Sequence, residues 1–401
     1  MSISSEPIVV AGAGIGGLTA ALQLARQGMS VTVLEKRTAL VEAGAGIQLS
    51  PNASRVLVSL GFGAAIGRRA VAPEQLSIRR LGDGRQLATM PLGAAIRTRH
   101  GAPYWVILRA DLHGVLLDAA RAEPGIRLLV GKHVTGMAER DDHAEVHFET
   151  GNGTPQTLRT PLLIGADGVR SKLRSVIGDG DAPRFRNFEA WRCVIPRDSV
   201  PERLRAHDVV AWLGRNAHVV HYPVAGGGAW NLVVIVRSQS AAEGWGLPME
   251  HGKLGAFLAS IPAPALGDLR ALLLGGENWR LWSLHDALPA VRWSTPHATL
   301  LGDAAHPVLP FLAQGGAMAI EDAAVLGEAL AVHAGNTRAA LAAYEEARYP
   351  RVRRVMEESR SNGRSFHFSG AIAVVRDLLL RHFGAEGLNR RYDWLYGWQP
   401  D

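Results

Sequence analysis

Cysteine is nearly absent from this sequence, because Cys193 is the single one among 401 residues. A lone cysteine cannot form an intramolecular disulfide, so nothing points to an oxidising compartment. The N-terminus also lacks the basic segment that precedes the apolar core of an export signal. We therefore expect a cytoplasmic protein.

Long apolar runs and a dominant sign of charge are absent as well. Runs such as 162–166 and 298–301 are far shorter than the roughly 20 residues of a membrane-spanning helix, so no integral membrane association is expected. Lys and Arg number 43 against 37 Asp and Glu, and the arginines form no aromatic-interleaved basic stripe. Nucleic-acid binding is not expected. The modest positive excess can instead draw small anionic substrates towards a cleft.

What the sequence does have is a glycine-rich turn between two short apolar runs. The runs at 8–11 and 31–34 flank this turn and an Ala/Leu-periodic stretch, the pattern of a strand, a helix and a second strand. The turn at 12–17 satisfies the spacing G-x-G-x-x-G. The complete unit predicts dinucleotide binding, although glycines also occur in turns that bind nothing.

Each glycine of that motif has a separate physical task. Gly12 permits the tight turn, Gly14 lets the backbone approach a pyrophosphate, and Gly17 allows close helix packing. The first amides of the helix then face the anion. Glu35 ends the second strand, where a carboxylate can accept hydrogen bonds from an adenosine ribose.

The pattern of apolar and polar residues changes twice along the rest of the chain. Apolar runs at 162–167 and 299–303 each end in a turn with an aspartate, as buried parallel strands would. The segment 185–284 is rich in Trp, Val and alternating residues and predicts a mostly antiparallel sheet. Helical patterns follow at 315–332 and from 337 to about 360.

Three separated motifs give the chain a family resemblance over nearly its whole length. They are the glycine motif with Glu35, then Gly165-Ala166-Asp167-Gly168-Val169-Arg170-Ser171, then Gly302-Asp303-Ala304-Ala305-His306-Pro307 running on to Glu321-Asp322-Ala323. In this order they resemble the FAD-dependent class A aromatic hydroxylases, in the branch of salicylate, 3-hydroxybenzoate and 6-hydroxynicotinate hydroxylases. The resemblance implies non-covalent FAD, with NADH or NADPH as a transient co-substrate.

The expected fold is α/β, or α+β overall, with a Rossmann-like FAD-binding domain, a mostly antiparallel substrate domain and C-terminal helices. The FAD-binding domain is expected to be discontinuous. The expected boundaries are 1–72, 98–184 and 285–334 for the FAD-binding domain, 73–97 and 185–284 for the substrate domain, and 335–401 for the C-terminal helical region. Monomer and homodimer both stay open.

The resemblance also implies flavin contacts. Asp303 would bind the ribityl chain, Asp167 would lie near the pyrophosphate and the nicotinamide passage, and Arg109 would contact the flavin. The helix after Gly315 would turn its first amides towards the flavin's pyrimidine edge, where charge builds up on reduction. A purely structural role is the alternative for each residue: Asp303 could cap a turn, and Arg109 could form a surface ion pair. The expected cofactor-binding set is Gly12, Gly14, Gly17, Glu35, Lys36, Arg109, Asp167, Asp303, Gly315 and Gly316.

A histidine and a tyrosine four residues apart, His218 and Tyr222, lie in a predicted strand. Because strand side chains alternate, they should share one face, and His221 should take the other. In the hydroxylases that the chain resembles, a His and a Tyr at this spacing face the substrate. With Pro310, which resembles the proline beside the flavin's reactive carbon, they form the expected catalytic set; a hydrogen-bonded core pair is the alternative.

Two substitutions bear on the substrate. Gln48 and Phe311 stand where the nicotinate branch carries histidines, which favours a benzenoid acid or phenol over a pyridine. With Gln314 they form the expected substrate-binding set, and no metal site is expected.

The implied reaction uses NAD(P)H and molecular oxygen to hydroxylate a phenolic aromatic acid through a flavin C4a-hydroperoxide. The alternatives are a related monooxygenase or halogenase with a non-phenolic or polycyclic substrate, and a non-catalytic flavoprotein.

Overall fold

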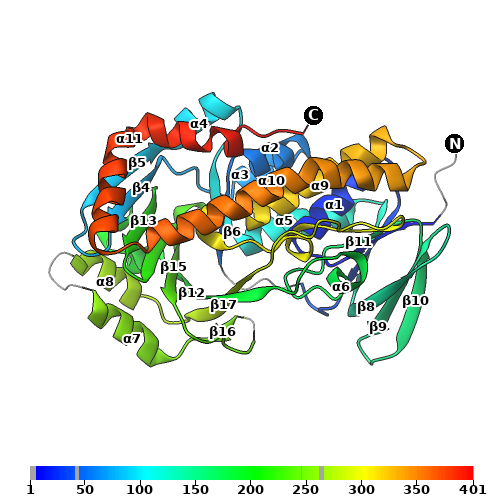
Figure 1. Ribbon diagram of the computed structural model, residues 1–401, viewed down its shortest axis with the longest axis horizontal. Helices are drawn as coiled ribbons and strands as arrows, with labels where there is room; N and C mark the ends of the chain where they lie inside the picture. The colour runs from blue at the N-terminus through cyan, green and yellow to red at the C-terminus, as the bar shows by residue number, and fades with distance from the viewer. Residues whose placement is uncertain (1–5, 41–44, 245, 262–265, 401) are drawn as a thin grey trace.

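The protein is built on two large sheets joined by long helices (Figure 1). The structure is a computed structural model and describes residues 6–40, 45–244, 246–261 and 266–400. Within these residues, no helix combines the length and the apolar character needed to cross a membrane.

A parallel sheet holds the N-terminal unit, as the sequence predicts. All its neighbouring strands are parallel, and β1 lies between β2 and β11. The carboxyl ends of β1, β11 and β18 therefore lie at one edge, which brings the three motifs of the sequence together. The strands in spatial order are β18 (Ala298–Leu300), β11 (Leu163–Gly165), β1 (Ile8–Ala11), β2 (Val31–Glu35) and β7 (Ile126–Val130).

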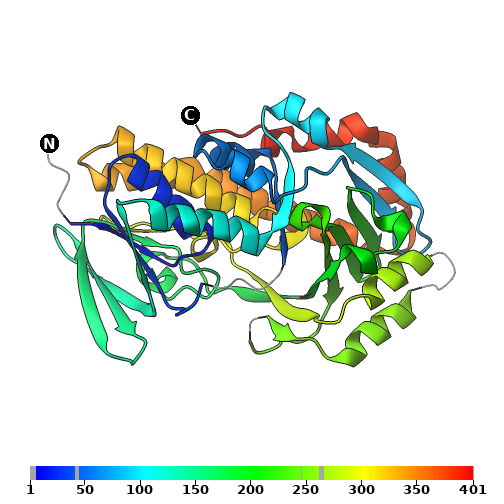
Figure 2. The same cartoon turned by 180° about the vertical axis from the view of Figure 1, so that it is seen from behind.

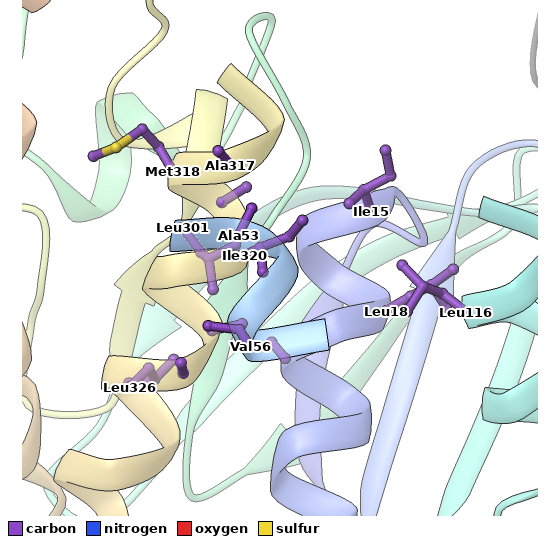
Figure 3. Close-up of a cluster of buried hydrophobic side chains, with 14 of the residues drawn as sticks. Ile15, Leu18, Ala53, Val56, Leu116, Leu301, Ala317, Met318, Ile320 and Leu326 are labelled. Carbon is purple, nitrogen blue, oxygen red and sulfur yellow. The ribbon is translucent and has the colours of Figure 1, made fainter. Parts of the chain in front are cut away.

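Helices pack tightly over this sheet. A Cβ added at Gly16 of α1 (Ile15–Arg26) would lie 2.9 Å from the Ala319 Cβ of α9 (Gly315–Val332), so the missing side chain lets the two helices approach closely. Figure 3 shows their apolar contact, with Leu18 of α1 close to Leu116 of α5 (Arg109–Ala122). Side chains from α2 (Pro51–Ser59) join the same cluster. This packing fixes the helix starts that follow the motifs.

The second sheet is mostly antiparallel, which confirms the prediction; among the described strands of this sheet, only the β13–β4 pair is parallel. The strands in spatial order are β16 (Leu247–Pro248), β17 (Arg280–Asp286), β12 (Arg184–Pro196), β15 (Ala229–Arg237), β14 (Ala217–Val224), β13 (Val209–Gly214), β4 (Gln75–Arg80) and β5 (Gln86–Pro91). One face packs on α7 (His251–Ser260) and α8 (Gly267–Leu274). The other face turns towards the parallel sheet.

Smaller elements complete the frame, and Figure 2 shows them from behind. Antiparallel strands β8 (Lys132–Glu139), β9 (Ala144–Thr150) and β10 (Pro155–Thr160) form a projecting sheet, and β3 (Gly46–Leu49) pairs with β6 (Trp105–Leu108). The short helices are α3 (Gly63–Gly67), α4 (Gly93–His100) and α6 (Arg174–Ile177), with 3-10 turns at η1 (Arg197–Ser199), η2 (Glu202–Leu204), η3 (Ala225–Gly227), η5 (Gly302–Ala304) and η6 (Pro310–Leu312).

Two long helices close the chain. Helix α10 (Thr337–Phe366) runs past the end expected near residue 360 because its last turns pack on η6. There Ser359 Oγ donates to the Leu309 carbonyl at 2.7 Å, and Gly363 lies against the Phe311 ring. Helix α11 (Gly370–Tyr396) has a left-handed Gly384 at a kink and packs against β5 (Figure 1).

Candidate active site

The glycine loop after β1 shows which glycines the fold itself requires. Gly12 has a φ of +113°, and a Cβ there would lie 2.4 Å from the Ala166 carbonyl oxygen. A Cβ at Gly17 would lie 2.0 Å from the Gly12 oxygen. A Cβ at Gly14 would meet no heavy atom within 4 Å. Gly12 and Gly17 thus serve packing, whereas Gly14 leaves the loop open to an approaching anion.

Glu35 ties this loop to the end of β2. Its Oε2 accepts a hydrogen bond from the Ala13 amide at 2.9 Å, and its Oε1 accepts one from the Arg37 amide at 2.9 Å. The residue is only 4% exposed, so its carboxylate is a fixed acceptor. Lys36 is exposed next to it.

Two aspartates follow the neighbouring strands β11 and β18. Asp167 Oδ2 accepts the Lys172 amide at 2.8 Å, while its Oδ1 is buried and has no partner in the described part of the chain. The Asp303 carboxylate is exposed and makes no hydrogen bond with any described residue. Burial raises the pKa of Asp303, and the charge of Arg109 opposes that rise.

The start of α9 faces Asp303. A Cβ at Gly315 would lie 3.9 Å from Asp303 Oδ1, and one at Gly316 would collide with Ile47 of β3 at 2.5 Å. Gln314, which precedes the helix, is buried, and its Nε2 donates to Ser50 Oγ at 2.9 Å. Its amide is therefore engaged inside the protein, which supports a role in holding the helix start better than contact with a substrate.

A buried charge network lies beneath this region. Asp322 accepts hydrogen bonds from the Gly302 amide at 2.8 Å, from His306 Nε2 at 2.7 Å and from Arg348 Nε at 2.7 Å. Burial alone would raise the pKa of Asp322, but His306 and Arg348 outweigh it and lower the pKa to about 2. Arg348 also binds Glu321 at 2.7 Å. This network fixes η5 and α9 to α10, and His306 is a buried member of it.

We call the loops around Gly12–Gly17, Asp167 and Asp303 the cofactor edge. They are held together by the strand order and by Arg174, whose Nε donates to the Ala304 carbonyl at 2.8 Å and whose Nη2 donates to that of Asp303. The edge thus combines open helix N-termini with two carboxylates that have unused acceptors.

The large sheet contributes a second group of side chains. His218, Val220 and Tyr222 of β14 point to the face near the parallel sheet, while His221 points to the opposite face and stacks on Trp212. Ladder pairing places Arg192 of β12 on the same face as His218, through Val233 and Val220. We call this side the His218 face.

His218 is paired with a second histidine that no sequence pattern singled out. Its Nδ1 lies 2.9 Å from Nε2 of His367, the residue after α10. Phe311 packs beside both rings, with centroids 5.6 Å from His218 and 5.8 Å from His367. Burial lowers the pKa of His218 well below its usual value, and His367 adds to the effect. Burial also lowers the pKa of His367 to about 4.

Tyr222 lies against the strand pair β3–β6. A Cβ at Gly46 would lie 2.6 Å from its ring, and Gln48 lies beside its hydroxyl. Gln48 Oε1 accepts a hydrogen bond from the Tyr104 hydroxyl at 2.5 Å. Burial raises the pKa of Tyr222, whereas Arg192 and Gln48 favour the phenolate and oppose that rise. The Tyr222 hydroxyl is thus neutral and lies among the polar side chains of Gln48 and Arg192.

The sequence interpretation missed Tyr104, Arg192 and His367. The alternation of β12 could have found Arg192, because Trp191 and Cys193 point to the α7–α8 side and leave Arg192 on the other. Nothing in the sequence near Tyr104 or His367 relates them to β14, because tertiary packing alone brings them there.

Comparison with known proteins decides the family. The family model described as "FAD binding domain" matches residues 6–359. The chain belongs to this FAD-binding family. It is 38% identical over 395 residues to the 3-hydroxybenzoate 6-hydroxylase of Klebsiella oxytoca, covering 98% of this chain and 97% of that protein.

Two further similarities support the same assignment. The 3-amino-4-hydroxybenzoate 2-monooxygenase of Streptomyces platensis is 38% identical over 394 residues, 98% of this chain and 96% of that protein. Klebsiella pneumoniae HpxO, solved with FAD and uric acid, superposes with a TM-score of 0.85 at 25% identity, covering 98% of this chain and 97% of that one. The resemblance to class A flavoprotein hydroxylases is confirmed, and the protein is an FAD-dependent monooxygenase that uses NAD(P)H.

FAD fits the residues of the cofactor edge. The loop at Gly14 is open, as a pyrophosphate requires, and Asp167 Oδ1 is an orphaned buried acceptor. The Asp303 carboxylate likewise has accepting capacity for hydroxyl groups. These acceptors suit the polyol and ribose hydroxyls of a dinucleotide.

Proposed function

We propose that this monooxygenase hydroxylates a phenolic aromatic acid. The observation that carries the proposal is the pairing of His218 and Tyr222 on one face of β14, with Phe311 packed against His218. A basic nitrogen and a hydroxyl beside an aromatic ring suit a ligand that is itself an aromatic ring with a hydroxyl group. Two similar proteins are named for hydroxylating 3-hydroxybenzoate and 3-amino-4-hydroxybenzoate, which are both such acids.

FAD, when bound, supplies the redox chemistry by taking a hydride from NAD(P)H and activating oxygen. The chain's part is to hold the ring, accept its phenolic proton and exclude water. We assign the proton to His218 Nε2. When Nδ1 of His218 donates to His367, Nε2 carries the lone pair that can accept the proton.

The low pKa of His218 agrees with this role in the free protein. Burial keeps the imidazole neutral, so its lone pair is available at neutral pH. A phenolate formed beside it would pair with the imidazolium and offset the cost of burying that charge. The base is thus strengthened only when the substrate is in place.

The neighbouring residues favour a benzenoid ring. Phe311 and Pro310 offer an apolar wall that keeps water away, and Gln48 stands where the nicotinate branch carries a histidine. We assign Tyr222 and Gln48 to the substrate's polar groups. Gln314 is left out because its amide is engaged with Ser50.

We assign the flavin to the cofactor edge in the same way. Gly14 and the amides of α1 are proposed for the pyrophosphate, with Gly12 and Gly17 shaping the loop. Glu35 and Lys36 are proposed for the adenosine end. The ribityl chain and ring are assigned to Asp303, Arg109, Gly315 and Gly316, with Asp167 near the pyrophosphate.

A substrate panel tests the proposal. Purified protein should carry FAD that acid releases without a covalent adduct. Salicylate, 3-hydroxybenzoate, 4-hydroxybenzoate and 6-hydroxynicotinate are screened for faster NAD(P)H oxidation, with the product identified by mass. At least one benzenoid acid should gain one oxygen. Stimulation by polycyclic or non-phenolic compounds alone would contradict the proposal. We also propose that the protein is cytoplasmic and is a monomer or a homodimer. Gel filtration tests the oligomeric state.

A further inference from the structure

Arg192 has a guanidinium whose partner is missing. It lies on β12, opposite Val233 of β15, which in turn pairs with Val220 of β14. This ladder row is adjacent to those of His218 and Tyr222, on the same face of the sheet. Arg192 is therefore on the His218 face, two strands away from the proposed base.

No described residue neutralises this cation. Its guanidinium forms no ion pair or hydrogen bond within residues 6–40, 45–244, 246–261 and 266–400, and its Nε is buried without an acceptor. It lies over the Trp282 ring, 5.4 Å from the centroid. Burial lowers the pKa of Arg192, and the charge of Arg109 lowers it further.

A buried arginine normally has an anionic partner, because an unpaired charge away from water is costly. Here the protein places a second arginine in the neighbourhood, and the nearby polar group is the neutral hydroxyl of Tyr222. The residue is only half-buried, so a ligand can reach the guanidinium. The arrangement is that of an anion site awaiting its ligand.

We propose that Arg192 binds the carboxylate of the aromatic substrate and makes the enzyme select acids over neutral phenols. The planar guanidinium matches a carboxylate in a two-point contact, and the Trp282 ring supports the cation from one side. When the substrate's carboxylate is bound at Arg192 on β12, its phenolic hydroxyl points along the same face of the sheet towards His218 on β14. This inference rests on the proposed function and adds the residue that recognises the acid group.

The test compares an acid with its neutral amide in the holoenzyme. kcat/KM is measured for 3-hydroxybenzoate and 3-hydroxybenzamide, or for the best acid of the panel and its amide. Arg192→Met should reduce the value for the acid by about 10- to 100-fold, the worth of a hydrogen bond to a charged group, and change that for the amide by less than about threefold. FAD content and the KM for NAD(P)H should stay unchanged.

Arg79→Met is the matched control. Arg79 also lies 5.4 Å from a tryptophan centroid, that of Trp212, and its Nε is likewise buried without a partner. It is on the opposite face of the same sheet, beside His221. The acid-to-amide ratio should be unaffected in this variant.

Several outcomes would overturn the inference. An equal loss for acid and amide would make Arg192 structural, and a raised KM for NAD(P)H or lost FAD would assign its anion to a dinucleotide phosphate. If Arg192→Met does not fold, Arg192→Lys decides, because a lysine keeps the charge without the fork and should lower the acid-to-amide ratio partly. An unchanged ratio there refutes the inference. Wild type that hydroxylates neither ligand class refutes the proposed function instead.

Discussion

The cofactor edge and the His218 face recognise their ligands by different means. At the cofactor edge the backbone shapes the site, since a Cβ added at Gly12 or Gly17 would lie only 2.4 Å or 2.0 Å from a backbone oxygen and no side chain fits there. On the His218 face, side chains from β12, β14, the β3–β6 pair and the end of α10 meet through tertiary packing. Recognition by the backbone is visible in the sequence as short local motifs. Recognition by side chains depends on strand register and is visible in few sequence motifs.

Substitutions in these two regions should therefore have different effects. Changes at the cofactor edge or its support should lose FAD and stability together, because the loops and their buried network form one unit. Changes on the His218 face should leave FAD and the fold in place and affect only the chemistry.

Arg348→Met should have the largest effect on stability. It removes the buried cation that Asp322 and Glu321 share and leaves His306 beside Asp322 and Arg351 beside Glu321. Breaking a buried pair in this way costs about 3 to 5 kcal/mol. Urea unfolding and FAD retention after gel filtration measure the loss. Arg353→Met is the control on the same helix, because its pair with Glu357 is exposed and should contribute little. Equal stability of the two variants would mean that the network does not support the cofactor edge.

His218→Ala should slow hydroxylation by about 10² to 10⁴-fold, the usual cost of removing a general base. FAD content should remain that of wild type, and more NAD(P)H should be consumed without product, with hydrogen peroxide formed instead. His221→Ala removes a ring on the opposite face, whose burial lowers its pKa to about 3, and should keep product per NAD(P)H unchanged. A larger chemical defect in His221→Ala would show that the catalytic side of β14 has been misassigned.

The three motifs that the sequence singled out lie together in the structure, because the strands that precede them are neighbours in the parallel sheet. The alternation of side chains along one strand predicted that His218 and Tyr222 lie on the same face of the sheet. The sequence could not predict His367, which meets His218 across 149 positions of sequence at the end of a helix that continues past its expected boundary. Gln314 shows a second limit of the sequence pattern, since the sequence did not indicate that its side chain is buried and bonded to Ser50.

Glu35→Ala tests the cofactor edge with a smaller change. FAD affinity should fall by about 1 to 3 kcal/mol, because a charged acceptor for ribose is lost. The Ala13 amide also loses its partner, so the loop should loosen. Fluorescence titration of apoprotein with FAD measures the affinity, and the preference between NADH and NADPH should not change. A changed preference would place the nicotinamide dinucleotide at this loop.

Tyr222→Phe should have the smallest effect and separates two roles on the His218 face. The change removes one hydroxyl from a buried ring and leaves the contact with Gly46 in place, so folding and FAD content should be those of wild type. If the hydroxyl only anchors the substrate, KM should rise by a factor that corresponds to about 0.5 to 1.5 kcal/mol, while product per NAD(P)H stays constant. If it relays the phenolic proton to His218, coupling should fall as in His218→Ala. We expect the anchor, because burial raises the pKa of Tyr222 and makes it a poor proton carrier, whereas His218 offers a neutral nitrogen on the same face.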